Sequence, residues 1–196
     1  MKVIIFILLV SFSSACFAQK EINSASLKIS YFGEMITHPG LKCGIEYSLL
    51  TRNISKETKR KTKEKKCEII IGSNLGAYTH FKYNTGVFLN GEIGYRTTRS
   101  TGNIFDFMFG AGYLRTFLNS ETFEIGENAE VNKVFLAGNN SFMPSVSFGF
   151  GRDISQKSEV FDSWYLKPII FLQTQHNSGI LPHLALEAGL NFQLNK

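Results

Sequence analysis

The chain has 196 residues, a formal net charge of +5 and 43% hydrophobic residues, and aromatic residues make up 13% of it. Beyond the first 19 residues, no stretch approaches the roughly 18 to 20 consecutive apolar residues of a membrane-spanning helix. The near-neutral mean hydropathy of −0.03 then leaves two classes, a soluble β protein or a membrane barrel whose apolar residues occupy every second position.

The N-terminal residues have the organisation of a secretion signal. Lys2 supplies a short positive region, an uninterrupted apolar run follows it, and Ala18 precedes a cleavage point before Gln19. We therefore predict a signal peptide over residues 1–18 and one mature domain over residues 19–196, since about 175 residues form one domain rather than two. Acylation at Cys16, as in a lipoprotein, is the alternative.

Eight segments of the mature chain alternate apolar with small or polar side chains, the pattern of a strand with one oily face. Alternation is clearest in residues 184–194. Each segment is long enough for the about 9 to 11 residues that a tilted strand needs to cross a bilayer. The segments cover residues 24–33, 41–52, 66–80, 83–99, 104–118, 142–153, 164–176 and 183–194.

Alternation also assigns the two faces of each segment. Lipid-facing positions are predicted at Leu27, Ile29 and Tyr31, at odd residues 43–49, at odd residues 105–113, at even residues 146–150 and at even residues 184–194. The opposite face carries glycines and charges, which suit a packed lumen rather than a channel. We expect a lumenal ion-pair network of Lys28, Lys42, Arg96 and Lys167 with Glu46, Glu92, Asp106 and Glu187.

Aromatic residues lie near the ends of several segments, and one segment contains a proline. Tyr78, Tyr83 and Tyr95 at one rim, with Trp164 and Tyr165 at the other, are predicted to form interfacial aromatic girdles. A proline at position 168 removes a hydrogen-bond donor inside a strand, so we expect a β-bulge there.

The connections between segments differ in length and charge. If both termini are periplasmic, the long connection 119–141 is extracellular and the turn 100–103 is periplasmic. Residues 52–66 carry eight Lys or Arg against two Glu, also on the periplasmic side. Such charge density predicts a mobile connection, which is either a solvated turn or an electrostatic contact for anionic lipid headgroups or an acidic partner.

The mature chain retains Cys43 and Cys67, which an exported protein could join in a disulfide or keep as unpaired thiols. Pairing of the two strands as a simple hairpin places Cys43 opposite the region around Ser73 rather than opposite Cys67. The cysteines and the four scattered histidines have no metal-ligand spacing, so we predict no metal site and no cofactor.

One cluster of residue types has catalytic potential. Gln175-His176-Asn177-Ser178 resembles the His-x-Ser motif of the lipid A 3-O-deacylases, which are outer-membrane barrels. The resemblance implies His176 as general base, Ser178 as nucleophile and Glu187 as the carboxylate that orients the imidazole. Glu187, however, has inward parity in the middle of a strand, so we favour polar turn residues and no catalytic site.

The whole mature chain resembles small outer-membrane barrels of the OmpA membrane domain and OmpX-like class, on its signal, its eight segments and its C-terminal strand. This resemblance implies an all-β, eight-stranded antiparallel up-and-down transmembrane β-barrel in the bacterial outer membrane, with a structural or surface-interaction role. The alternatives are a lipid A ester hydrolase and a periplasmic small-ligand-binding barrel. We expect a monomer that contacts outer-membrane lipids, lipopolysaccharide and the barrel-assembly machinery, and no nucleic acid.

Overall fold

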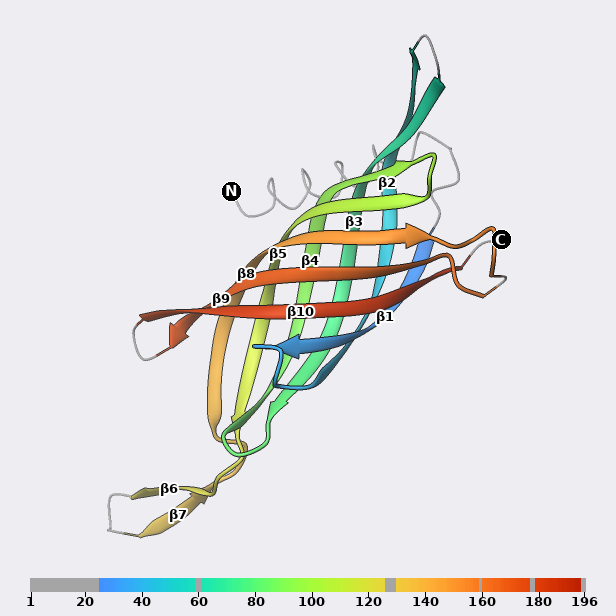
Figure 1. The fold of residues 1–196 in the computed structure, drawn as a ribbon. Helices are drawn as coiled ribbons and strands as arrows, with labels where there is room; N and C mark the ends of the chain where they lie inside the picture. The colour runs from blue at the N-terminus through green and yellow to red at the C-terminus, as the bar shows by residue number, and fades with distance from the viewer. Residues whose placement is uncertain (1–24, 59–60, 126–129, 159, 177–178, 195–196) are drawn as a thin grey trace, which may run out of the picture.

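The computed structural model describes residues 25–58, 61–125, 130–158, 160–176 and 179–194. Eight strands form one closed, antiparallel ring in the order β1-β10-β9-β8-β5-β4-β3-β2 (Figure 1). Their bounds are β1 Ala25–Glu34, β2 Gly40–Thr58, β3 Lys61–His80, β4 Asn84–Arg99, β5 Asn103–Leu118, β8 Gly138–Asp153, β9 Ser163–His176 and β10 Gly179–Gln193. The predicted eight-stranded up-and-down barrel is therefore confirmed.

The barrel closes between its first and last strands. β1 pairs with β10 over nine residues, from Ser26 opposite Gln193 to Glu34 opposite Ala185. Closure means that neither β1 nor β10 is the free edge of a sheet. Within the described residues, no helix is long and apolar enough to cross a membrane.

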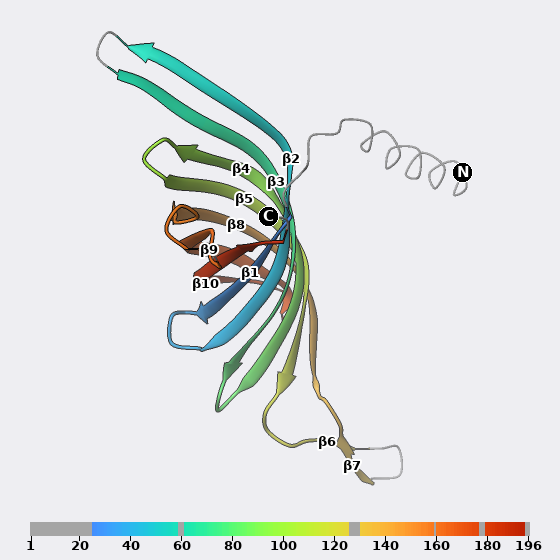
Figure 2. The same cartoon turned by 90° about the vertical axis from the view of Figure 1, so that its right-hand side faces the viewer.

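The two ends of the barrel are distinguished by their connections. At the terminal end, where β1 begins and β10 ends, the β2–β3 hairpin extends far beyond the wall (Figure 2). At the opposite end, here called the distal end, lie the turns that leave β1 and β3, the end of β9 and the connection that leaves β5. That last connection contains the short hairpin of β6 (Thr122–Ile125) and β7 (Val131–Val134).

Burial along the strands confirms the assignment of the faces. Charged residues predicted inside are almost fully buried, as Lys28 (2% exposed) and Glu187 (0%) illustrate. Many large apolar side chains on the outer face are 38–58% exposed, both on β1, β2, β5, β8 and β10, where lipid-facing positions are predicted, and on β3, β4 and β9, for which the sequence assigned none. They include Ile29, Tyr31, Ile45, Tyr47, Ile69, Ile71, Leu75, Leu89, Ile93, Phe105, Phe109, Phe148, Phe150, Leu166, Ile170 and Leu184.

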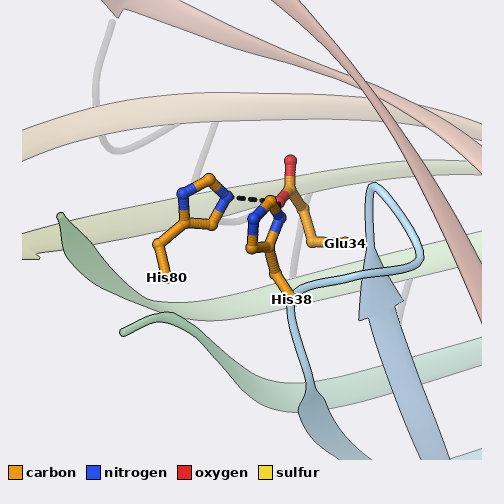
Figure 3. Close-up of side chains that lie close together, drawn as sticks. All are labelled: Glu34, His38 and His80. Atoms are coloured by element: carbon orange, nitrogen blue, oxygen red, sulfur yellow. Dashed lines mark hydrogen bonds and ion pairs between the residues drawn. The ribbon is translucent and has the colours of Figure 1, made fainter. Parts of the chain in front are cut away.

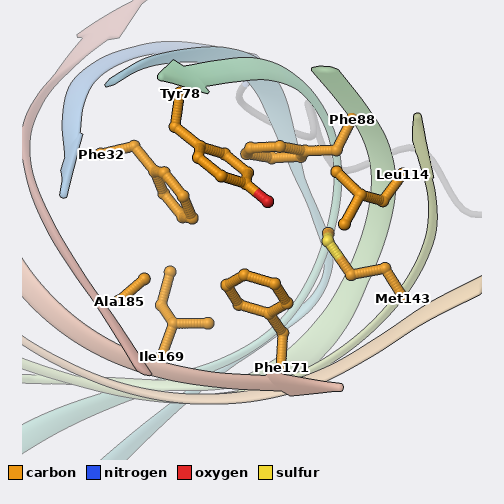
Figure 4. Close-up of a cluster of buried hydrophobic side chains, with 8 residues drawn as sticks. All are labelled: Phe32, Tyr78, Phe88, Leu114, Met143, Ile169, Phe171 and Ala185. Carbon is orange, nitrogen blue, oxygen red and sulfur yellow. The ribbon is translucent and has the colours of Figure 1, made fainter. Parts of the chain in front are cut away.

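The distal half of the interior holds apolar side chains that sequence analysis did not predict. Figure 4 shows them converging from around the ring: Phe32, Tyr78, Phe88, Leu114, Met143, Ile169, Phe171 and Ala185. We call this cluster the apolar plug. Small residues on the same inner face make room for it: a side-chain carbon added at Gly76 would lie 2.3 Å from the ring of Phe88.

The basic segment 52–66 differs from its prediction. It is not an irregular connection, because β2 and β3 continue as a ladder from Arg52 opposite Cys67 to Thr58 opposite Lys61. Backbone hydrogen bonds form a hairpin whatever the side chains are. The charged residues of this segment whose side chains are described, Arg52, Glu64, Lys65 and Lys66, are exposed to solvent, which weakens the repulsion between like charges. A β-bulge between Ser48 and Leu50 lies where this extension begins.

The starts of two strands and the pairing around Pro168 also differ from their predictions. β8 begins at Gly138 and β10 at Gly179, several residues before the predicted starts at 142 and 183. The expected β-bulge at Pro168 is absent from the ladders, which keep one register through this region. The β8–β9 ladder instead omits the pairs of Phe148 and Gly149, between Ser147 opposite Ile169 and Phe150 opposite Leu166. A missing donor has thus weakened the pairing without shifting it.

Two of the five residues predicted to form aromatic girdles point into the barrel, and the two cysteines are unpaired. Tyr78 and Tyr165 are 3% and 5% exposed and point inward, so their assignment to girdles was wrong. Tyr83, Tyr95 and Trp164 are exposed, but Tyr95 lies toward the terminal end with Trp164 rather than at the distal rim with Tyr83. Cys43 and Cys67 are both free thiols. Cys43 pairs with Leu75 and Cys67 with Arg52, so the register separates the two cysteines along the hairpin.

Candidate functional site

The middle of the interior is crossed by the predicted ion-pair network. Lys42 contacts Glu92 and Glu187, each at 2.9 Å, and Lys28 contacts Glu46 at 2.7 Å. Five strands, β1, β2, β4, β9 and β10, supply its lysines and glutamates. Lys167 lies 3.7 Å from Glu92 and completes the central cluster.

Arginine extends the network toward the terminal end. Arg96 binds Asp106 through two nitrogens, with Nε at 2.7 Å and Nη2 at 2.6 Å from the two carboxylate oxygens. The same Nη2 lies 3.1 Å from Glu46, which links this pair to Lys28. The network contains four cations and four carboxylates, so the buried charge is balanced.

The structure describes the deacylase-like motif only through the backbone of His176 and through Glu187. The side chain of His176 and the whole of Ser178 lie outside the described residues. The backbone of His176 pairs with Gly179, whereas Glu187 is eight positions further along β10, a distance of roughly 26 Å. Glu187 is instead held by Lys42, by the Tyr165 hydroxyl at 2.6 Å and by the Ser30 hydroxyl at 3.0 Å.

A second polar cluster lies at the distal end, where three histidines surround one carboxylate. Glu34 ends β1 and is only 2% exposed. Its Oε2 lies 2.6 Å from His38 Nδ1 and 3.1 Å from His80 Nε2, and its Oε1 lies 2.7 Å from His183 Nδ1 (Figure 3 shows the first two contacts). We call these four residues the mouth cluster.

The turn between β1 and β2 shapes this cluster. Met35 and Ile36 have φ angles of 46° and 66°, in the left-handed region that a β-branched residue rarely adopts. Reciprocal backbone hydrogen bonds join Glu34 and His38 across the turn, at 3.0 and 2.9 Å. The chain thus returns tightly enough to place the His38 ring beside the Glu34 carboxylate.

The amino-acid sequence predicts the ion-pair network but not the mouth cluster. His38, His80 and His183 are far apart in sequence, and only the ladders of β2 with β3 and of β1 with β10 bring them to one place. A usable signal existed, because His80 and His183 stand at the ends of predicted strands and His38 in the predicted turn between two of them, all at the distal end.

Comparisons with known proteins give fold-level similarities only. No family model matches the chain, and no curated protein matches it. Among solved structures, the N-terminal β-barrel domain of Pseudomonas aeruginosa OprF is 14% identical, with 87% of this chain and 98% of that chain covered and a TM-score of 0.43. The Yersinia pestis attachment invasion locus protein Ail is 10% identical, with 87% and 97% covered and a TM-score of 0.34.

The β domain of the Bordetella autotransporter Brka is also similar, at 13% identity, with 86% of this chain and 66% of that chain covered and a TM-score of 0.38. The fold assignment rests on this chain's own closed ladder of eight strands. The strand number and topology agree with the predicted resemblance to small outer-membrane barrels.

Proposed function

We propose that this protein is a bacterial outer-membrane β-barrel with a filled lumen, which acts as a structural or surface-interaction protein rather than as a channel. The observation that supports this most strongly is the outer surface of the barrel. Large apolar side chains are exposed on all eight strands of the ring. Soluble monomers rarely expose such a continuous apolar surface.

The height of the apolar surface also suits a bilayer. Outward positions 87–95 of β4 and 142–150 of β8 carry no charge, and each range covers nine residues. Tilted strands of this length match the about 25 Å apolar band of outer-membrane barrels. The charged side chains of these strands lie inside or at the ends.

The interior supports a closed lumen. The apolar plug occupies its distal half, and the ion-pair network crosses its middle with Lys42, Glu92 and Glu187 nearly inaccessible to solvent. A small barrel filled by its own side chains leaves no continuous water path. The parts available for contact with other molecules are therefore the distal connections and the basic hairpin.

The same observations weigh against the alternatives. A soluble ligand-binding barrel places its apolar face inside and its polar face outside, whereas here the apolar residues cover the outer wall. A deacylase of the predicted type would need Glu187 beside His176, and the β9–β10 register separates their backbones.

Proteolysis of intact cells tests the location and the orientation together. We expect trypsin to cleave after Lys133 in β7. The Lys133 side chain is half-exposed, and the proposed orientation places the distal end in the external medium. The basic hairpin 52–66 should resist cleavage until the outer membrane is opened, since the terminal end faces the periplasm. Immunoblotting of the fragments provides the measurement.

A matched variant identifies the distal cleavage. Lys133→Gln should remove the fragment that ends at residue 133 and leave cleavage of the hairpin in opened cells unchanged. Hairpin fragments from intact cells would show that the orientation is reversed. Recovery of the full-length protein in the soluble periplasmic fraction would refute the membrane location.

A further inference from the structure

We propose that the mouth cluster is a binding site for a divalent transition-metal ion, with Zn²⁺ as the reference ion and with His38, His80 and Glu34 as its ligands. The donor atoms of these three residues all lie within 4.8 Å of one another. They come from β1, the β1–β2 turn and the end of β3, so an ion would fasten two distal turns to the wall.

The donor set selects the class of ion. Two imidazole nitrogens and one carboxylate oxygen form a combination that protein Zn²⁺ sites use, with a further position open to water. Imidazole suits Zn²⁺, Cu²⁺ and Ni²⁺, whereas Mg²⁺ and Ca²⁺ prefer sites built from oxygen atoms alone. We therefore expect binding of Zn²⁺ and no competition from Mg²⁺ or Ca²⁺.

The two rings converge closely on the carboxylate. The centroids of His38 and His80 are 3.0 Å apart, and both rings direct a nitrogen at Glu34 Oε2 (Figure 3). A cation between the nitrogens and the carboxylate would replace these hydrogen bonds with ligand bonds.

His183 acts on the site as a positioning residue. Its Nδ1 contacts Glu34 Oε1 and leaves Oε2 directed at the other two rings. The His183 ring stacks on Phe171 of the apolar plug, with centroids 4.7 Å apart and an interplanar angle of 1°. Contacts of this kind orient the ligand atoms in metal sites.

The position of the cluster determines how an ion would reach it. His38 and His80 are 23% and 27% exposed, whereas the Glu34 side chain is 2% exposed. An ion would enter from the distal side and meet the carboxylate at the bottom of the site. The apolar plug lies in the same half of the lumen and offers one hydroxyl, that of Tyr78, and no charged ligand to pass the ion onward, so the site would hold the ion without transporting it.

The test uses the full mature chain, without a polyhistidine tag, folded in detergent micelles. Equilibrium dialysis against micromolar ZnCl₂ should give one bound Zn²⁺ per folded chain. His38→Ala and His80→Ala should each weaken binding by about a hundredfold or more, and His183→Gln by about tenfold, as expected for a contact that orients a ligand. His176→Ala, which changes the remaining histidine, is the matched control and should bind as the wild type does.

A second readout covers variants that fail to fold. Zn²⁺ should raise the unfolding temperature of the wild-type protein, because an ion that binds only the folded state stabilises it, and Mg²⁺ should not. Absence of bound Zn²⁺ from the folded wild type would overturn the proposal, as would equal loss of binding in His176→Ala. The assay is carried out in micelles, so its outcome does not depend on where the protein resides in the cell.

Discussion

Replacing Lys42 by methionine should lower the free energy of unfolding by about 3–5 kcal/mol, the usual cost of breaking a buried ion pair from one side. Lys42 is 3% exposed and bridges Glu92 and Glu187. Methionine keeps most of the side-chain volume, but it removes the ammonium group that neutralises the buried carboxylates of Glu92 and Glu187. Urea titration of the protein folded into lipid vesicles, followed by tryptophan fluorescence, measures the change.

Two controls separate the charge effect from a general sensitivity to mutation. Lys133→Met removes a lysine whose ion pair with Glu121 is exposed, so it should change the free energy of unfolding by no more than about 1 kcal/mol. The double variant Lys42→Met/Glu187→Gln removes one charge of each sign and should cost less than Lys42→Met alone. A double variant that costs the sum of the two single changes would mean that the network does not couple these residues.

Arginine at position 93 should destabilise the folded barrel by about 2–4 kcal/mol, the cost of a basic side chain on the lipid face near the middle of the bilayer. Ile93 is 50% exposed on β4, close to the centre of the uncharged outer band. In a soluble protein, the same exposed position would accept arginine at little cost. The same urea titration in vesicles gives the measurement.

Ile125→Arg is the matched control for Ile93→Arg. Ile125 is 79% exposed in β6, in the small hairpin outside the barrel wall. We expect its replacement to change stability by less than about 0.5 kcal/mol. Equal tolerance of arginine at the two positions would argue against a lipid-facing wall.

The sequence predicts the barrel and its two faces because one physical pattern, the alternation of side chains along a strand, repeats eight times. Lys28, Glu92 and Glu187 could be placed inside from parity alone, and the structure confirms them as partners in one network. The ends of the strands are less predictable from the sequence, as the extension of β2 and β3 to Thr58 and Lys61 shows. Where the chain leaves the barrel wall the alternation stops, although the backbone of the basic hairpin continues to pair.

The apolar plug and the mouth cluster could not be predicted in the same way. Seven strands each contribute one or two residues to the plug, such as Phe32 or Phe88, and β2 contributes none of its residues; one or two exceptions in a strand do not alter a period of two. Tyr78 and Tyr165 were assigned to girdles from their residue type, although their position in the alternation places them inside. The histidines around Glu34 meet only through the register of the closed barrel, which no local pattern specifies.

The central claim, that the outer wall of this barrel is made for lipid, is tested most directly by folding the urea-unfolded chain with and without a bilayer. Diluted into lipid vesicles, the chain should gain the circular dichroism of β structure and migrate as a compact band on a cold gel, which shifts on boiling. Diluted into buffer alone, it should aggregate, because the exposed apolar band would have no partner. Recovery of a folded, soluble monomer in buffer without lipid or detergent would contradict the account.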